Sequence, residues 1–391
     1  MEGASVVLGS ATPAVDSYYK ALRGEYELLT LKKRAMQQSL PQVYTVDLRE
    51  ELRSGNRSII SDKLRELMED RIRKKEQIML FINRRGYAGF ISCRSCGYVV
   101  KCPHCDVSLT EHNDGTLVCH YCGYSVELTG RCDNCGDSHL RLLGAGTQKV
   151  EEELHAAFPG REILRMDTDT VSATHSHEKL LSRFEKERIP VLVGTQMVAK
   201  GLDFENVTLV GVISADLSLY VDDYRAGERT FSLLTQVVGR AGRGAKQGRA
   251  VIQTFTPEND VIRCAARQDY DSFYEQEIEL RRMRLCPPFR ELFVLTASGP
   301  LESAVLRTCM RLRRSLEGWL AQPPFRDWEL TVLGPAPASV AKINDRYRYR
   351  LTLAAQNTKE IRAMVAHLVR CAQTDKENKG VSVSADVNPL D

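Results

Sequence analysis

The chain has 391 residues and a formal net charge of +3, and 43% of its residues are hydrophobic, 27% charged and 7% aromatic. The length predicts two to three domains, and the composition is typical of a globular protein. So small a net charge is by itself no argument for nucleic-acid binding. No apolar run reaches the ~18 residues of a membrane span, and the start MEGASVVLGS lacks the layout of a secretory signal, so we expect no membrane association and a cytoplasmic location.

The first part of the chain alternates between apolar strands and amphipathic helices. VVLG at 6–9 predicts the end of a buried strand, and a helix is expected over 13–23. A second helix is expected over 60–75, with its charges on one face. It leads into QIMLFIN at 77–83, whose continuous apolar run predicts a second buried strand.

From about residue 139, after a cysteine-rich stretch, strand and helix alternate again. The expected strands are short and rich in β-branched residues: 162–167, 190–195, 207–213 and 249–255. The helices between them are expected over 146–157, 176–187 and 228–241. This spacing favours an α/β domain with a parallel sheet, and the cysteine-rich stretch is interpreted as an insertion in that domain.

CPPF at 286–289 marks a boundary, because consecutive prolines end the long charged helix before them. Beyond it we expect, in order, strand 291–298, helix 301–321, strand 328–333, strand 346–354, helix 358–371 and strand 381–387. This βαββαβ order predicts a ferredoxin-like α+β sandwich as a C-terminal domain.

Eight of the twelve cysteines form four Cys-x-x-Cys pairs: Cys93/Cys96, Cys102/Cys105, Cys119/Cys122 and Cys132/Cys135. Clustered pairs in a cytosolic chain usually bind metal, and eight thiolates suit two closed, structural four-cysteine zinc sites. Gly97, Gly123 and Gly136 follow three of the pairs and permit the positive φ of a tight knuckle turn. A disulfide framework is the weaker alternative. Because eight thiolates suffice, the nearby His104, His112 and His120 are interpreted as loop residues.

The stretch between the second and third pairs indicates which pairs share an ion. VSLTEHNDGTLV predicts two short strands around an Asn-Asp-Gly turn, a hairpin that brings the second pair back against the third. The first and fourth pairs would then share the other ion, in a nested arrangement. Sequential pairing remains open.

TQVVGRAGRG at 235–244 is expected on a helix that ends at glycine. Gln236, Arg240 and Arg243 are spaced i, i+4 and i+7, so a helix would project them from one face. Two guanidinium groups there suit the charge on a transferring γ-phosphoryl group, the role of an arginine finger. Gly239 and Gly242 are expected to keep the neighbouring surface low for a second domain or a ligand. A solvated basic face is the alternative.

Two further stretches suit phosphate groups. GTQMVAKGLDF at 194–204 follows a buried strand, so Thr195 lies at a strand's carboxyl end, where open α/β sheets bind ligands. Its hydroxyl, the loop amides and Lys200 suit a nucleic-acid phosphate, and Asp203 is placed to steer arginines or a nucleotide. In RYRYRLTLA at 346–354, alternation puts the arginines on one sheet face and the tyrosines and leucines on the other. That row could follow a phosphate backbone, or be an ordinary solvated face.

Together these motifs resemble the superfamily 2 helicases, in which SAT, GTxxxxKGxDF and QxxGRxGR occur in this order. LFINRRGYAGFISCRSCG at 80–97, the four cysteine pairs and the proline-marked C-terminal domain narrow the resemblance to the bacterial primosomal protein N′ family of replication-restart helicases. The likeness runs from about residue 5 to the end. It implies a RecA-like second helicase lobe, nested zinc pairing and ATP-dependent 3′-to-5′ DNA helicase activity.

The resemblance also implies roles for the motif residues. Those expected to couple ATP to DNA movement are Ser10, Ala11, Thr12, Gly201 and Asp203. Those expected on the DNA path are Thr195, Gln196 and Lys200, joined by Arg346, Arg348 and Arg350, while Gln236, Arg240 and Arg243 face the nucleotide. The implied cofactors are two zinc ions, with ATP and Mg²⁺ in the intact protein. The implied partners are forked or single-stranded DNA, single-stranded DNA-binding protein, and primosome and helicase-loading proteins.

The chain departs from the family in one respect: it contains no GKS or GKT and no Asp-Glu dipeptide, so the phosphate loop and acidic box are missing. We therefore interpret it as the C-terminal part of such a helicase, able to bind DNA but inactive alone. The expected parts are the end of the first lobe (1–35), the second lobe (36–91 and 139–286), the zinc insertion (92–138) and the C-terminal domain (287–391). The alternatives are a non-enzymatic zinc-containing adaptor for DNA or protein and, disfavoured by the zinc insertion, an RNA helicase.

Overall fold

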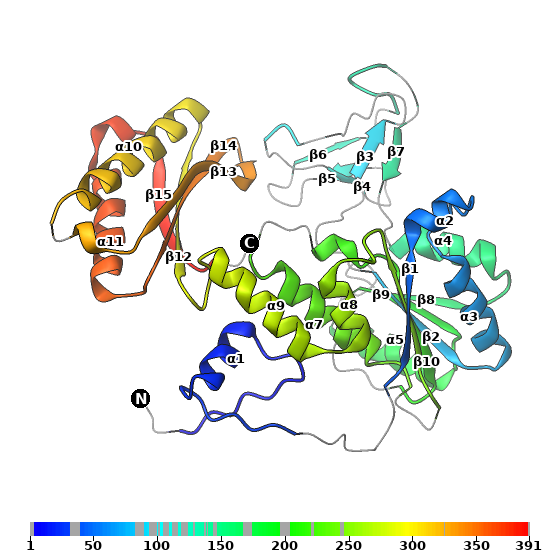
Figure 1. Ribbon diagram of the computed structural model, residues 1–391. Helices are drawn as coiled ribbons and strands as arrows, with labels where there is room; N and C mark the ends of the chain where they lie inside the picture. Colours follow the sequence, from blue (N-terminus) through cyan, green and yellow to red (C-terminus); the bar gives the residue numbers. More distant parts are fainter. Residues whose placement is uncertain are drawn as a thin grey trace. The chain divides into compact units, whose positions relative to one another are not determined.

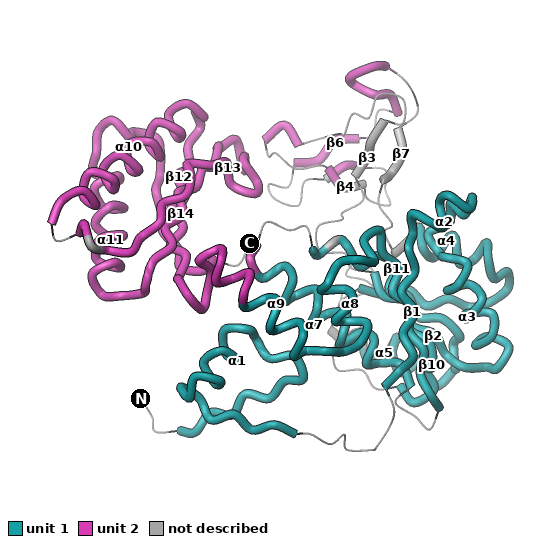
Figure 2. The backbone as a smooth tube through the Cα atoms, in the orientation of Figure 1, with its two compact units in different colours: residues 1–88, 144–221, 225–278 teal, residues 89–143, 222–224, 279–391 magenta. Residues whose placement is uncertain are grey.

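The computed structural model describes residues 4–31, 40–82, 147–166, 174–195, 204–219, 223–242, 246–323 and 325–389, with short pieces between 90 and 143. Those pieces are 90–93, 100, 102–104, 109–111, 116–118, 124–127, 130–136, 138 and 140–143. The chain divides into two compact units (Figure 2). The first consists of Met1–Ala88, Gly144–Val221 and Arg225–Ile278, and the second of Gly89–Leu143, Asp222–Tyr224 and Glu279–Asp391.

Six parallel strands form the centre of the first unit, several of them labelled in Figure 1. Their hydrogen-bonded order is β1-β11-β10-β2-β9-β8. They are β1 Gln42–Asp47, β2 Gln77–Phe81, β8 Ile163–Met166, β9 Val191–Gly194, β10 Val207–Val212 and β11 Arg249–Thr254. Every residue of β2, β9 and β10 is buried, as expected for strands covered on both faces of a parallel sheet. The predicted α/β domain is confirmed, and so is the insertion of the cysteine-rich segment between two strands of one sheet, β2 and β8.

The helices of the first unit are α1 Val15–Leu22, α2 Leu48–Arg53, α3 Asp62–Arg73, α4 Thr147–Ala157, α5 Thr174–Lys186, α7 Ala226–Val238 and α8 Asp260–Arg267. The start of α9 Tyr270–Met283 and the short 3₁₀ helix η1 Asp216–Ser218 also belong to it. Apolar side chains of α3 and α4 pack with those of β2, β9, β10 and β11 in one core. Among the described residues, no helix is both long and apolar enough to cross a lipid bilayer.

The predicted strand at 6–9 is wrong. Residues 4–10 lie in no helix or strand, and Val6, Val7 and Leu8 are 80%, 85% and 77% exposed. A strand needs a neighbour for its backbone N–H and C=O groups, and among the described strands none pairs with this segment. The apolar sequence is therefore open to solvent.

The second unit contains a four-stranded antiparallel sheet with two long helices against it (Figure 1). Its elements are β12 Glu291–Gly299, α10 Glu302–Leu320, η2 Phe325–Asp327, β13 Thr331–Ile343, β14 Arg346–Ala355, α11 Lys359–Thr374, η3 Lys376–Asn378 and β15 Ser382–Val387. The strand order β13-β14-β12-β15 places the first and third strands of the βαββαβ sequence in the centre. This is the ferredoxin-like arrangement, so that prediction is confirmed.

The cysteine-rich segment forms a small sheet in the second unit, in the order β6-β5-β4-β3-β7. Its strands are β3 Phe90–Cys93, β4 Thr110–Glu111, β5 Thr116–Val118, β6 Ser125–Glu127 and β7 Leu140–Leu143. β4 and β5 pair antiparallel, with Thr110 opposite Val118, so the predicted hairpin strands are confirmed. The Asn-Asp-Gly turn between them lies outside the described residues.

Candidate functional site

The carboxyl edge of the parallel sheet carries the first predicted site residue. The strand registers align Phe81, Gly194 and Val212 at this edge. Thr195 directly follows Gly194 and is 7% exposed, so its predicted place at a strand's carboxyl end is confirmed. The other predicted residues of this loop, Gln196, Lys200, Gly201 and Asp203, lie outside the described residues.

A buried aspartate organises the same edge and was not predicted from the sequence. Asp216, in η1, accepts hydrogen bonds from the hydroxyls of Thr254 (2.6 Å) and Thr256 (2.7 Å) and from the backbone N–H of Phe255 (3.0 Å). These three donors all belong to the end of β11 and the turn after it. The carboxylate therefore fixes the connection after β10 to the connection after β11.

The helix that follows this edge brings two distant motifs together. The hydroxyls of Thr12, from SAT, and Ser232, on α7, lie 2.9 Å apart. Ser232 Oγ in turn accepts a hydrogen bond of 2.9 Å from the exposed Gln236 Nε2, one helical turn further along α7. The sequence predicts roles for Thr12 and Gln236 but not for Ser232, although Ser232 precedes Gln236 by four residues and so shares its helix face.

The residues after Thr12 anchor this segment further. The carbonyl oxygen of Pro13 accepts a hydrogen bond of 2.8 Å from the Tyr270 hydroxyl. Tyr18 of α1 packs edge-on against Tyr270 and Tyr274, with ring centroids 5.3 and 4.7 Å apart. Val15 is completely buried. Polar and aromatic contacts therefore hold the segment against α7 and α9, while Ser10 and Ala11 sit just before its anchored part.

α7 ends earlier than predicted. It stops at Val238, with Gly239 as its C-cap, whereas the sequence predicts a helix to residue 241. Arg240 is therefore half-buried beyond the helix, and helical spacing does not place it on the face of Gln236. Arg243 lies outside the described residues.

The second glycine of this motif also has a different role from the one expected. Gly242 has φ +73°, and a Cβ there would lie 2.2 Å from the backbone nitrogen of Gly248. The chain's own fold thus requires glycine at this position. Its N–H donates to the carbonyl of Val207, the first residue of β10. The turn after Arg240 thus lies at the amino edge of the sheet, opposite the edge that holds Thr195.

A buried ion cluster holds the loop beyond that turn. Glu76, just before β2, accepts hydrogen bonds from Arg71 Nη1 (2.7 Å) and Thr208 Oγ1 (2.6 Å), and its other oxygen lies 2.9 Å from Lys246 Nζ. Although burial opposes it, hydrogen bonds from Thr208, Arg71 and Lys246 lower the pKa of Glu76 to about 2. Glu76 therefore stays ionised and fixes Lys246, which lies between Gly242 and β11.

Among the residues that the structure describes, no group of three or more His, Cys, Asp or Glu side chains could hold a metal ion, and the described cysteines of the four pairs differ in burial. Cys102 and Cys132 are 5% and 2% exposed, and the N–H of His104 points to Cys102 Sγ at 3.4 Å, the knuckle geometry that stabilises a thiolate. Gly136 has φ +72°, as predicted for a knuckle turn, and Cys135 is exposed. β3 pairs with β7 so that Cys93 lies opposite Leu140. The remaining cysteines of the pairs, Cys96, Cys105, Cys119 and Cys122, lie outside the described residues.

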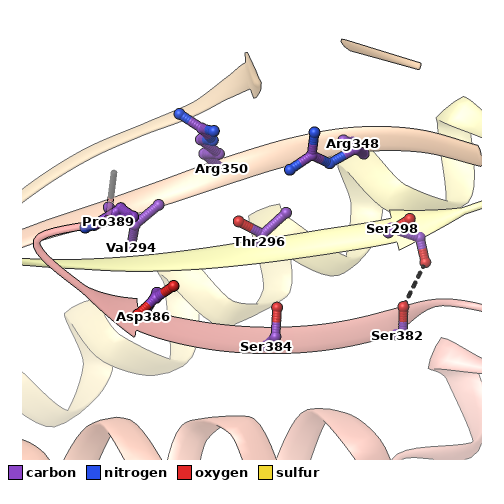
Figure 3. A pocket seen from close by; sticks show the side chains of 9 residues that line it. All are labelled: Val294, Thr296, Ser298, Arg348, Arg350, Ser382, Ser384, Asp386 and Pro389. Carbon is purple, nitrogen blue, oxygen red and sulfur yellow. Dashed lines mark hydrogen bonds between the residues drawn. The ribbon is translucent and has the colours of Figure 1, made fainter. Parts of the chain in front are cut away.

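The open face of the C-terminal sheet carries the predicted arginines. Arg348 and Arg350 line a hollow of about 350 Å³ with Thr296 and Ser298 of β12 and with Ser382, Ser384 and Asp386 of β15 (Figure 3). Arg346 lies on the same face and donates to the carbonyl oxygen of Ser298 at 2.7 Å. Tyr347 and Tyr349 pack against the core on the opposite face, so the predicted alternation is confirmed. The hollow is mainly hydroxyl and guanidinium in character, with one carboxylate.

Three family matches cover different parts of the chain. Residues 143–245 match the helicase conserved C-terminal domain, residues 102–126 the PriA DNA helicase Cys-rich region domain, and residues 282–390 the primosomal protein N C-terminal domain.

Whole-chain comparisons give the same family. The chain is 45% identical over 385 residues to replication restart protein PriA of Bacillus subtilis, covering 98% of this chain and 47% of that protein. It is 41% identical over 360 residues to PriA of Synechocystis, covering 90% of this chain and 43% of that protein, and 35% identical over 395 residues to PriA of Chlamydia trachomatis, covering 100% and 51%. The chain thus spans about half the length of the curated relatives it matches.

Proposed function

Because this chain belongs to the family of replication restart protein PriA, we propose that it supplies the second helicase lobe, the zinc module and the C-terminal domain of an ATP-dependent 3′-to-5′ DNA helicase. The observation that carries the proposal is the contact between two helicase motifs 220 residues apart. Thr12 of SAT reaches Gln236 of QxxGRxGR through the single hydroxyl of Ser232. Because both motifs contact the same hydroxyl, a change in the position of one would affect the other.

The nucleotide-facing residues in this proposal are Gln236, Arg240 and Arg243. Amide and guanidinium donors fit phosphate oxygens, and Arg240 emerges from a turn that Gly242 and the Glu76–Lys246 ion pair support. In the intact protein ATP would bind there with Mg²⁺, and transfer of its γ-phosphoryl group to water would drive movement. Ser10, Ala11 and Thr12, with Gly201 and Asp203, would couple that site to DNA.

The DNA-facing residues would occupy two places. The first is the carboxyl edge of the parallel sheet, where Thr195 lies, and Gln196 and Lys200 are proposed from the sequence that follows it. Arg346, Arg348 and Arg350 belong to the open face of the C-terminal sheet, where guanidinium and hydroxyl groups suit phosphate oxygens. The expected partners are forked or single-stranded DNA, single-stranded DNA-binding protein, and primosome and helicase-loading proteins, in the cytoplasm.

We also propose two structural zinc ions in the nested arrangement. Two strand pairings support this arrangement: β4, which follows the second cysteine pair in the sequence, pairs with β5, which precedes the third, and β3, at the first pair, pairs with β7, which follows the fourth. The four parts proposed for the chain are 1–35, the end of the first lobe; 36–91 with 139–286, the second lobe; 92–138, the zinc insertion; and 287–391, the C-terminal domain.

ATP turnover with forked DNA tests the helicase assignment. The chain alone is expected to bind DNA without hydrolysing ATP, and adding an amino-terminal half that carries GKT and an acidic box is expected to restore hydrolysis. In that assembly Arg240→Ala should lower kcat about 10³-fold or more, as loss of an arginine finger does. Arg263→Ala, a matched change on an exposed arginine of α8, should leave kcat unchanged. Hydrolysis that Arg240→Ala does not slow would refute the role of that residue, and DNA binding with no restored hydrolysis would favour the adaptor.

DNA affinity measured across a salt series tests the open sheet face. Each of Arg348→Ala and Arg350→Ala should weaken binding and lower the slope of log K against log salt by about one. Arg362→Ala is the control, because Arg362 is an exposed arginine on α11, which is not part of that face. Equal slopes for all three variants would remove this face from the DNA path.

A further inference from the structure

The tip of the β13–β14 hairpin contacts the second cysteine knuckle within the same compact unit. The backbone N–H of Asp345 donates to the carbonyl oxygen of His104 at 2.9 Å, and Lys342 Nζ donates to the carbonyl oxygen of Pro103 at 3.0 Å. His104 Nδ1 and Asp345 Oδ2 lie 2.5 Å apart. Both residues between Cys102 and Cys105 are therefore held by one turn of the C-terminal domain.

The turn is built to present these donors rigidly. Ile343 pairs with Arg346, so only Asn344 and Asp345 connect the two strands, and both have positive φ (50° and 57°). That is the two-residue hairpin turn whose twist matches its strands and which Asn and Asp tolerate well. Lys342 is further fixed by lying over the Tyr347 ring, 5.3 Å from its centroid.

The contacted backbone is also the backbone that orients a zinc ligand. His104 accepts from the turn through its carbonyl oxygen and donates its own N–H to Cys102 Sγ at 3.4 Å. Cys102 is 5% exposed, so little water competes for that sulfur. A group that holds the peptide next to a ligand acts as an outer shell, and loss of outer-shell contacts typically costs metal affinity.

We infer that Lys342 and Asp345 are positioning residues of the zinc site that contains Cys102, so that the C-terminal domain helps to retain this ion. The inference rests on the proposed zinc sites. By linkage the effect must run both ways: the ion should also order the hairpin tip.

Zinc transfer from the full 391-residue chain to a chromogenic chelator tests the first direction. The variant is Lys342→Met with Asp345→Gly, which removes both side-chain contacts while glycine accepts the positive φ. One of two zinc ions should transfer about tenfold faster than in the parent chain, with the other unchanged. Lys359→Met, on α11, is the matched control and should transfer both ions at the parent rate. Parent-like transfer of both ions from the double variant would overturn the inference.

Amide hydrogen exchange on the unmodified chain tests the second direction and needs no substitution. Removing zinc should speed exchange in the peptide 342–347 about tenfold or more, while α10 and α11 keep their protection. Unchanged exchange at the hairpin tip would overturn the inference even if the double variant failed to fold. Zinc content per purified chain separates the two proposals: a chain without zinc refutes the metal sites themselves, whereas a zinc-loaded chain with no coupling refutes only the outer shell.

Discussion

The two large sheets of this protein use their surfaces differently. The six-stranded parallel sheet is covered on both faces, so its functional groups occur at the strand ends, as with Thr195, Asp216 and Glu76. In the described part of the chain, the four-stranded antiparallel sheet has helices on one face, and Arg348 and its neighbours line a hollow on the other. A polar side chain buried in the first sheet therefore depends on partners within the fold, whereas in the second sheet polar side chains line a hollow that a ligand could enter.

The largest loss of stability is expected when a buried polar group beside the parallel sheet loses its partner. Glu76→Gln removes the carboxylate on which Arg71 and Lys246 converge. Because the buried Arg71 would lose its nearer counter-charge and keep only Asp70, 3.5 Å away, we expect a loss of up to about 3–5 kcal/mol in the free energy of unfolding. Denaturant unfolding of parent and variant measures it. A loss below about 1 kcal/mol would mean that the amide replaces the carboxylate without penalty.

The next largest loss of stability is expected from a substitution in the core beneath the antiparallel sheet. Leu351→Ala removes a fully buried side chain from β14 and should cost about 2–5 kcal/mol. Arg348→Ala, three residues earlier on the same strand but on the open face, should change stability by less than about 0.5 kcal/mol. Similar losses in the two variants would show that the open face supports the fold.

Acid should weaken the first unit through Glu76. Its folded pKa of about 2 lies below its unfolded value, so its contribution is fully present above about pH 4.5 and disappears as the pH falls toward 2. The full shift corresponds to about 3 kcal/mol. Unfolding measured at pH 5 and pH 3 should show a steeper loss in the parent than in Glu76→Gln. Parallel pH profiles of the two proteins would exclude Glu76 as the source.

The smallest effect is expected from a single half-buried hydroxyl, that of Ser232. Ser232→Ala removes the bridge between Thr12 and Gln236 and should cost about 0.5–1.5 kcal/mol, the net value of a typical hydrogen bond. Since the bridge is local, faster amide exchange should be confined to residues 10–14. Ser272→Ala, which loses a hydrogen bond to Asp269 at the start of α9, is a matched control that should leave this exchange unchanged.

The sequence predicts those strands whose burial is visible in their own pattern of apolar and polar residues. β2, β9 and β10 are buried throughout and mostly apolar because both faces of their sheet are covered. In β14, arginines alternate with tyrosines because only one face of that sheet packs against the core. β1 was missed because it lies at the sheet edge and has a mixed pattern, with no fully buried run.

Residues whose role depends on a distant partner could not be found in this way. Glu76 meets Lys246, and Ser232 meets Thr12, through the fold alone. The early end of α7 was missed because it depends on the close approach of Gly242 to Gly248, which local helix periodicity does not encode.

α7 itself has a consequence for the connection between the sites. Its first turns are tied to the carboxyl edge, where the Thr230 hydroxyl donates to Ser218 of η1, and the turn after its last residue is tied to the amino edge at Val207. Thirteen residues at about 1.5 Å each make a strut of roughly 20 Å through the thickness of the domain. A single helix therefore connects Ser232, beside SAT, with the turn that carries Arg240, and its ends are anchored at opposite edges of the same sheet.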